Sequence, residues 1–207
     1  MNRRAMTKQS VIFILPLLAA LTACQQSTSP APAAAAIQGT ALDGSGIGGP
    51  FTLTDKDGKT VTWDQFKGKY RIVYFGYTFC PDACPTDLGR MMQGYLKFAE
   101  QHRDLADQVQ PIFITIDPAR DTPARVGQYA ANFTPRLLGL SGSQQQVDVA
   151  TAAFKVSAAR GEDRPGGYLM DHSRFAYLMD RDGKPLEALP LDLGPDAVAA
   201  DLARQVR

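Results

Sequence analysis

The sequence predicts an α/β fold, in which a central mixed sheet is flanked by helices. Strand-like stretches rich in β-branched and aromatic residues alternate with stretches whose apolar side chains recur at helical spacing. Asp-Gly turns at 57–58 and 182–183 join neighbouring strands directly, so part of the sheet is expected to be antiparallel. A hydrophobic content of 44% supports a real core, and a net charge of +1 argues against a nucleic-acid-binding protein.

The expected strands differ in how buried they are. Residues 70–77 read YRIVYFGY, and this run is expected as a buried strand at the centre of the sheet because it is rich in β-branched and aromatic residues. An N-terminal β-hairpin is predicted from 51–53 and 60–62, which flank the Asp57-Gly58 turn. The remaining strands are expected at 112–116, 137–140, 175–179 and 185–189, the last two forming a second hairpin.

Helices are predicted wherever apolar side chains recur every three or four residues. The longest is expected from Pro85 to about Arg103, with Pro85 in its first turn and Asp87 near the positive end of its dipole. Three more are expected at 122–132, at 143–154 and from about Pro195 onward, and the segment 160–167 is expected to be a polar, Gly-rich loop.

The first 23 residues predict a signal peptide. Basic side chains precede an apolar run over 11–21, which is shorter than the roughly 20 residues needed to span a membrane. The run ends in Leu21-Thr22-Ala23-Cys24, which resembles the lipobox of bacterial lipoproteins, whose Cys is lipidated and becomes the first residue of the mature chain. The resemblance predicts lipidation of Cys24 and a protein anchored in the bacterial cell envelope, facing the periplasm. An ordinary signal peptide with an incidental Cys is the alternative.

Removal of residues 1–23 changes the net charge of the chain and leaves a tether and a folded domain. It takes away three basic side chains and no acidic one, so the formal net charge falls from +1 to −2. Residues 24–45 are predicted to form a flexible tether, and 46–207 the folded domain. Export implies an oxidising compartment, and two thiols remain there, Cys80 and Cys84.

Cys80 and Cys84 lie between the predicted central strand and the helix that follows it. The carboxyl end of a strand that leads into a helix is a common place for chemistry in α/β sheets. The helix dipole is expected to lower a thiol pKa there, and more so for Cys84, which is nearer the helix start. A structural disulfide across so short a loop would contribute only about 2 kcal/mol. A redox-active dithiol and a metal site are therefore favoured. Two thiolates suit Cu(I), an added imidazole would allow Cu(II), and zinc uses the same donors.

Three stretches resemble the Sco/SenC family of copper proteins. The first is YFGYTFCPDACPTDL over 74–88, and the second is IDPARDTP over 116–123, which is similar to the family's D-P-x-R-D-T segment. The third is Asp171-His172-Ser173, at the point where the family places its histidine ligand. The motifs occur in the family's order across about residues 46–200, which is nearly the whole predicted domain.

The resemblance implies a thioredoxin-like fold and copper, as Cu(I) and Cu(II), held by Cys80, Cys84 and His172. It also implies that Cys80 and Cys84 can form a redox-active disulfide. The implied function is delivery of copper to the dinuclear copper centre of cytochrome c oxidase during its assembly. The expected partners are the apo copper-centre subunit, a periplasmic copper donor, a thiol reductant and, through the anchor, the membrane.

A thiol–disulfide oxidoreductase that keeps the cysteines of that subunit reduced is the alternative. Two features weaken this alternative. The C-x-x-x-C spacing differs from the C-x-x-C of thioredoxins, and no proline immediately precedes the strand at 175–179, where thioredoxins have a cis-proline beside the dithiol. A thiol peroxidase is disfavoured, because beyond Cys80, Cys84 and the predicted lipidation site the chain holds no Cys to resolve an oxidised thiol.

Three carboxylates are candidates for orienting the metal ligands without binding the metal themselves: Asp117, Asp121 and Asp171. Each also has a simpler interpretation. Asp121 could cap the helix that begins near residue 122, and Asp117 could bind backbone amides in the turn before it. Asp171 is next to His172, but adjacent side chains on a strand point to opposite faces.

Overall fold

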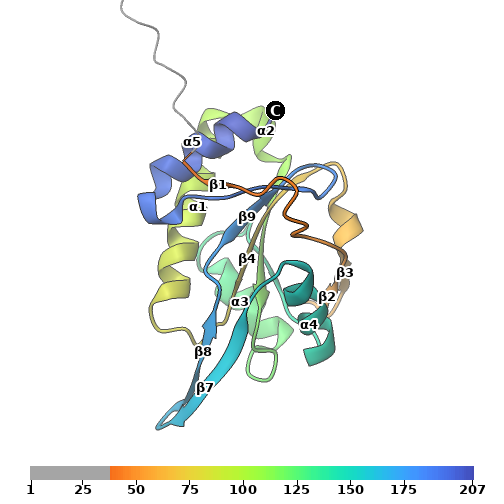
Figure 1. Cartoon of the computed structure of the whole chain (residues 1–207), viewed down its shortest axis with the longest axis vertical. Coiled ribbons are helices and arrows are strands. Elements are labelled where there is room, and N and C mark those ends of the chain that lie inside the picture. Colours follow the sequence, from red (N-terminus) through yellow and green to blue (C-terminus); the bar gives the residue numbers. More distant parts are fainter. Residues whose placement is uncertain (1–37) are drawn as a thin grey trace, which may run out of the picture. The chain divides into compact units, whose positions relative to one another are not determined.

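The structure, a computed structural model, describes residues 38–207 (Figure 1). Within these residues six strands form a mixed sheet in the order β1-β10-β9-β4-β5-β6. Strands β4, β5 and β6 run parallel to one another, whereas β9 is antiparallel to β4, and β10 and β1 continue the antiparallel half. In chain order the strands are β1 (Thr40–Ala41), β4 (Tyr70–Gly76), β5 (Val109–Thr115), β6 (Leu138–Leu140), β9 (Ala176–Met179) and β10 (Pro185–Ala188).

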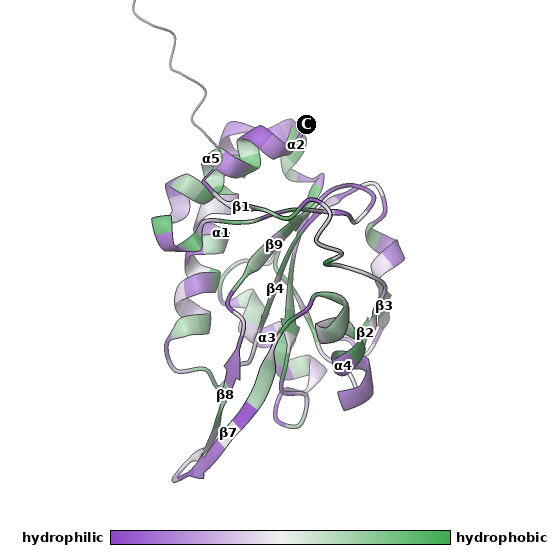
Figure 2. Ribbon diagram, viewed as in Figure 1, coloured by the Kyte–Doolittle hydropathy of each residue, from purple (hydrophilic) through white to green (hydrophobic). Residues whose placement is uncertain are grey.

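Strand β4 is central because its side chains, apart from that of Arg71, are apolar or aromatic on both faces. All seven of its residues are buried, with β5 on one side and β9 on the other. Figure 2 shows the hydrophobic residues concentrated along these central strands. The strand predicted from the YRIVYFGY run is therefore confirmed, and its carboxyl end leads directly to the two cysteines.

The helices follow the predicted segments closely. α1 packs against α5 with very close backbone approach, since a Cβ on Gly94 would lie 2.6 Å from Val198 Cβ. α3 follows β5, and Thr122 is its N-cap; α4 begins with a capping box formed by Ser143 and Gln146. The helical elements are α1 (Ala83–Gln101), α2 (Arg103–Ala106), α3 (Pro123–Ala131), α4 (Gln144–Ala153) and α5 (Pro195–Gln205), with 3₁₀ turns η1 (Trp63–Phe66) and η2 (Leu191–Leu193).

Two hairpins lie outside the central sheet. The predicted N-terminal hairpin is present as β2 (Thr52–Thr54) and β3 (Thr60–Thr62). The segment 160–167, predicted to be a loop, is instead part of a second hairpin, formed by β7 (Ala158–Arg164) and β8 (Gly167–His172), which projects from the body of the domain (Figure 1). Most residues of β7 are exposed, and on β8 exposed residues alternate with half-buried ones, so neither strand has the fully buried apolar side chains that would have predicted it.

The folded part begins earlier than residue 46, the predicted start of the domain. Thr40 and Ala41 pair with β10, and the amides of Gln38 and Gly39 donate to the Asp201 carboxylate at 2.7–3.2 Å. The end of the predicted tether therefore belongs to the domain. The predicted signal peptide and Cys24 lie outside the described residues. Across residues 38–207, none of the helices combines the length and apolar character of a membrane span.

Candidate metal centre

Cys80 and Cys84 lie where β4 leads into α1. Cys80 is on the connecting loop, and its amide donates to Tyr77 O at 3.3 Å. α1 begins at Ala83, two residues before the predicted start, so Cys84 lies in its first turn. The Cys84 amide, which has no partner inside the helix, donates to Cys80 Sγ at 3.3 Å. Both cysteines are free thiols, so the predicted redox-active disulfide stays a prediction.

His172, the last residue of β8, meets the two cysteines. Its Nε2 lies 3.2 Å from Cys84 Sγ, and the ligand atoms of all three side chains lie within 4.8 Å of one another. His172 Nδ1 lies 2.8 Å from Ser173 O, which can only accept a hydrogen bond. Nδ1 therefore carries the proton and Nε2 presents its lone pair towards the sulfur atoms, as in a metal-ligating imidazole.

The two thiols differ strongly in acidity. The Cys84 thiol donates to Cys80 and lowers the pKa of Cys80 to about 3, with further donation from the amides of Cys84 and Asp82. The hydrogen bond to Cys80 raises the pKa of Cys84, and complete burial raises it further. The prediction that Cys84 would be the more acidic thiol is wrong, because Cys80 is the sulfur that accepts from the amides at the helix start.

The walls of the centre are aromatic and closely packed. The rings of Tyr74 and Tyr77 meet the His172 ring edge-on, with centroids 6.4 and 6.0 Å away. Cys84 Sγ rests against the backbone of Gly76, where a Cβ would lie only 2.9 Å from the sulfur. On the outer side the centre opens into a cavity of about 260 Å³, whose lining includes Cys80, His172, Pro81, Leu169 and Arg174.

Asp121 supports the segment that leads to Cys80. Its buried carboxylate accepts from the amide of Thr78 at 2.9 Å and from the hydroxyls of Thr78 and Thr115 at 2.5 and 2.7 Å. It does not cap α3, because Thr122 Oγ1 accepts from the Arg125 amide instead. The helix-cap interpretation of Asp121 is therefore wrong.

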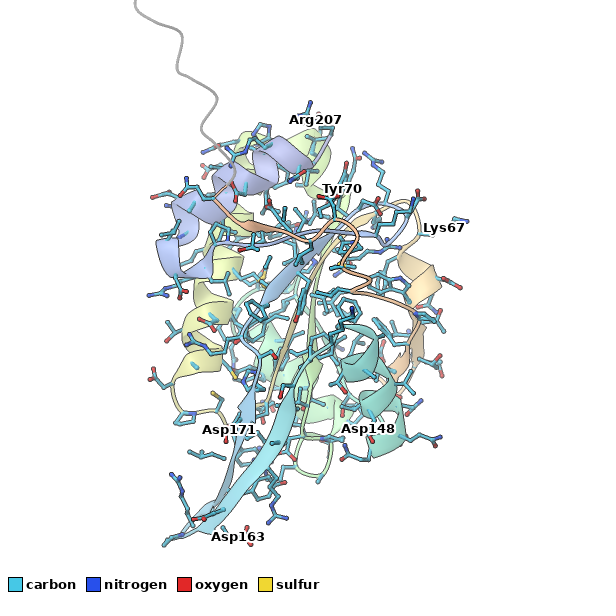
Figure 3. All side chains as sticks on the ribbon, viewed as in Figure 1. Lys67, Tyr70, Asp148, Asp163, Asp171 and Arg207 are labelled. Carbon is cyan, nitrogen blue, oxygen red and sulfur yellow. The ribbon has the colours of Figure 1, made fainter. Side chains whose placement is uncertain are left out.

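Asp117 contacts the hairpin that carries His172. Its carboxylate accepts from Arg120 Nε at 2.5 Å and from the Tyr168 hydroxyl at 2.8 Å. Asp117 does bind backbone amides of the turn, but through its main-chain oxygen, which accepts from the amides of Arg120 and Asp121 at 3.2 and 3.0 Å. Arg120 also donates to Tyr168 O and stacks on the Tyr168 ring, 3.6 Å from its centroid. Asp171 is exposed (Figure 3). Because adjacent side chains on a strand alternate, it points to the face of β8 opposite His172.

Asp87 is a buried charge that the sequence did not indicate. Its side chain is 1% exposed, and its carboxylate accepts two hydrogen bonds from Arg174, at 2.8 and 2.9 Å, and one from the Tyr74 hydroxyl at 2.9 Å. The position of Asp87 near the helix start predicted only a favourable interaction with the helix dipole. The partner Arg174 is 87 residues away in the chain, so no local pattern could predict the pair.

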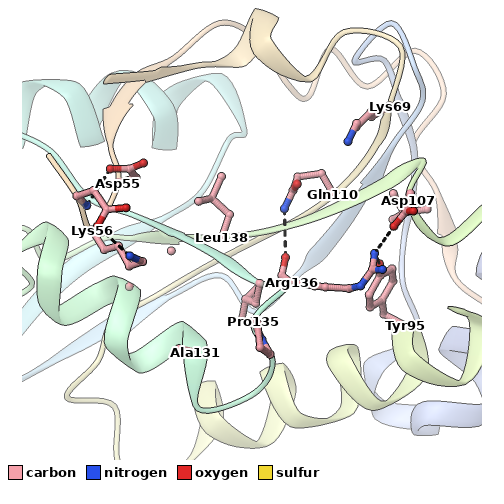
Figure 4. A pocket seen from close by; sticks show the side chains of 15 residues that line it. Asp55, Lys56, Lys69, Tyr95, Asp107, Gln110, Ala131, Pro135, Arg136 and Leu138 are labelled. Atoms are coloured by element: carbon pink, nitrogen blue, oxygen red, sulfur yellow. Dashed lines mark hydrogen bonds and ion pairs between the residues drawn. The ribbon is translucent and has the colours of Figure 1, made fainter. Parts of the chain in front are cut away.

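A larger cavity, about 550 Å³, lies elsewhere, between β6, α3 and the start of β5 (Figure 4). No Cys or His lines it, and two of its cations are paired: Arg136 with Asp107 at 2.7 Å and Lys56 with Asp57 at 2.8 Å. Among residues 38–207, Cys80, Cys84 and His172 are the one group of three or more His, Cys or acidic side chains gathered closely enough to hold a metal ion.

Comparison with known proteins decides the family. The model of the SCO1/SenC family matches residues 39–207. The chain belongs to the SCO1/SenC family. A SCO2-like protein of Rickettsia felis is 42% identical to it over 154 residues, which is 73% of each chain. The human mitochondrial SCO1 homolog is 35% identical over 162 residues, or 78% of this chain and 53% of the human one.

Solved structures of SCO1/SenC proteins share the fold. ScoI of Bradyrhizobium japonicum with copper bound is 43% identical, with a TM-score of 0.69 over 77% of this chain and 99% of that one. Yeast Sco1 with copper bound is 35% identical, with a TM-score of 0.70 over 77% of this chain and 87% of that one. These likenesses confirm the thioredoxin-like fold.

Proposed function

We propose that this SCO1/SenC protein binds copper through Cys80, Cys84 and His172 and delivers it to the dinuclear copper centre of cytochrome c oxidase during assembly of the oxidase. The observation that carries the proposal is the convergence of two sulfur atoms and an imidazole nitrogen within 4.8 Å. The family membership supports it, because the family is one of copper-binding assembly proteins of the oxidase.

The donor set fits copper in both oxidation states. A thiolate already present at Cys80 and a second thiol that a metal can deprotonate provide the soft ligands that Cu(I) prefers. The lone pair of His172 Nε2 adds the nitrogen donor that Cu(II) favours. The cavity beside Cys80 gives an ion, or the ligands of a receiving protein, access to the centre. Copper in this reaction is cargo, so a centre that is open on one side is suitable.

The surroundings of the cavity suit a protein partner. The large hydrophobic side chains of Phe79, Leu169 and Phe175 are 42%, 36% and 53% exposed. Leu169 lines the cavity, and Phe79 and Phe175 are the chain neighbours of Cys80 and Arg174, which also line it. Exposed apolar side chains gathered at a site are typical of an interaction surface. We propose the apo copper-centre subunit of the oxidase as the recipient, with a periplasmic copper donor and a thiol reductant loading and resetting the site.

We also propose a place for the protein in the cell. The N-terminal sequence up to Cys24 supports a lipoprotein anchored in the bacterial cell envelope and facing the periplasm. A periplasmic location would place the copper centre in the compartment where the recipient is expected.

A thiol–disulfide oxidoreductase is the second candidate, and the acidity of Cys80 favours it. The Cys80 thiolate would attack a disulfide of the oxidase subunit and release one of its thiolates, forming a mixed disulfide. Cys84, after losing its proton, would then attack Cys80 and release the second thiolate. The subunit gains two electrons, and Cys80 and Cys84 become a disulfide.

One experiment with two arms separates the candidates. In one arm the copper-loaded full chain is mixed with the apo copper-centre domain of the oxidase subunit, whose cysteines are reduced. In the other arm the metal-free, reduced full chain is mixed with the same domain, whose cysteines form a disulfide. Delivery predicts that the absorption of the dinuclear centre appears in the reduced arm, and that His172→Ala abolishes it. Free thiols formed in the oxidised arm by metal-free protein, with no copper transfer in the reduced arm, would favour the oxidoreductase.

A further inference from the structure

An ion pair links the two chain segments that hold the ligands of the candidate centre. Asp87 lies on α1, three residues after Cys84, and Arg174 lies two residues after His172. The Arg174 guanidinium donates to both oxygens of the Asp87 carboxylate, from Nε at 2.9 Å and from a terminal nitrogen at 2.8 Å. The pair therefore joins the helix of Cys84 to the segment between β8 and β9.

The pair is built so that it has one geometry. Asp87 is 1% exposed, and the Tyr74 hydroxyl accounts for a third hydrogen bond to its carboxylate. A charge so deeply buried needs its partner, and a bidentate arginine fixes both distance and direction. The Arg174 side chain is 48% exposed, so its stem reaches Asp87 from the surface. The peptide that carries Arg174 is therefore held against α1.

The orientation of the imidazole depends on that same peptide. His172 Nδ1 donates to Ser173 O, and Ser173 is the residue directly before Arg174. His172 otherwise ends a hairpin whose residues are largely exposed, attached on its other side through Tyr168 to Asp117 and Arg120. Movement of the Arg174 backbone would move Ser173 O, and the imidazole with it.

We propose that Asp87 and Arg174 are positioning residues for the metal centre, a clamp that holds His172 Nε2 against Cys84 Sγ. The inference rests on the proposed function, since it assigns a role towards copper. Cu(II) needs the imidazole, whereas Cu(I) tolerates two thiolates. The clamp is therefore required for Cu(II) binding much more than for Cu(I) binding.

The test compares Arg174→Met with Arg136→Met in the full chain. Methionine keeps much of the apolar stem and removes the cation in both variants. Arg136 is as exposed as Arg174 and pairs with a carboxylate, that of Asp107 at 2.7 Å, but this carboxylate is exposed and lies in the cavity away from the centre. Arg174→Met is expected to weaken Cu(II) binding at least about tenfold, which is about 1.4 kcal/mol. Cu(I) affinity should change less than about threefold, and Arg136→Met should change neither. Arg174→Lys keeps the positive charge but loses the two-point contact of the guanidinium, so its Cu(II) affinity should lie between those of Arg174→Met and wild type. This variant provides the test if Arg174→Met does not fold.

Two further measurements show whether the clamp acts through His172. In a His172→Ala background, Arg174→Met should cause no additional loss of Cu(II) affinity. In the metal-free protein, the Ser173 amide, which donates to Ser157 O at 3.0 Å, should exchange at least about tenfold faster in Arg174→Met than in wild type. This exchange needs no copper, so it tests the clamp even if the centre proves to bind none. Unchanged Ser173 exchange, or equal loss of Cu(I) and Cu(II) affinity, would overturn the proposal.

Discussion

Gly76→Ala tests how tightly the Cys84 sulfur is seated. The new Cβ would lie 2.9 Å from Cys84 Sγ, 3.1 Å from Phe113 Cε2 and 3.2 Å from Tyr74 Cε1. Real Cβ contacts below 3.0 Å essentially never occur, so the sulfur must shift. All three neighbours are fully buried, and none can move out to solvent.

The expected change in the free energy of unfolding follows from two opposing effects. Overpacking a well-filled core destabilises the protein by about 1–3 kcal/mol, whereas replacing Gly by Ala stabilises it by roughly 0.4–1 kcal/mol because it restricts the unfolded chain. We therefore expect Gly76→Ala to lower the free energy of unfolding by about 1–2 kcal/mol. Cu(I) affinity should fall several-fold, because the displaced sulfur is one of the two soft ligands.

Denaturant unfolding of the metal-free protein measures the first effect, in wild-type and Cys84→Ala backgrounds. Removing the sulfur relieves the shortest contact, so the cost of Gly76→Ala should shrink by at least about 0.5 kcal/mol in the Cys84→Ala background. Gly89→Ala is the matched control, because its Cβ would meet nothing within 4 Å, and in the interior of α1 it should stabilise the protein. An equal cost of Gly76→Ala in both backgrounds would refute the reasoning.

Three further predictions address the anchor, the thiol and the imidazole. Cys24→Ala should abolish attachment of lipid, measured by mass spectrometry, and leave thermal unfolding unchanged; a lipidated variant would contradict this. Because the pKa of Cys80 is lowered to about 3, its alkylation by a haloacetamide should stay constant as the pH falls from 8 to 5. An ordinary thiol loses about a thousandfold over that range, and such a decline at Cys80 would refute the assignment. His172→Ala should keep Cu(I) binding but weaken Cu(II) binding at least about tenfold in a competition titration; unchanged Cu(II) affinity would remove His172 from the centre.

Local patterns predicted much of the fold. The β-branched and aromatic run of β4, the two Asp-Gly turns and the prolines at helix starts depend on nearby residues only, and all are where they were expected. The strands that were missed lack such a signal. β7 and β8 expose most residues, and β1 is a strand only because it pairs with β10, far along the chain.

The sequence indicated which residues form the candidate site, but not the acidity of its thiols or the contacts around it. The Cys pair is local, but only family resemblance pointed to His172, which is 88 residues beyond Cys84. The acidity of the two thiols was assigned the wrong way round, since it depends on which sulfur accepts from the helix amides. Asp87 was missed because its burial depends on Arg174, a contact that only the folded chain creates.

Copper loading of the reduced protein tests the central claim most directly. Wild type should take up one copper per chain, and its Cu(II) form should show thiolate-to-copper charge-transfer absorption, because two thiolates are ligands. The Cys80→Ser/Cys84→Ser variant should lose most of the uptake and all of that absorption. Equal copper uptake by wild type and the double variant would contradict the account, because it would place the copper at other residues.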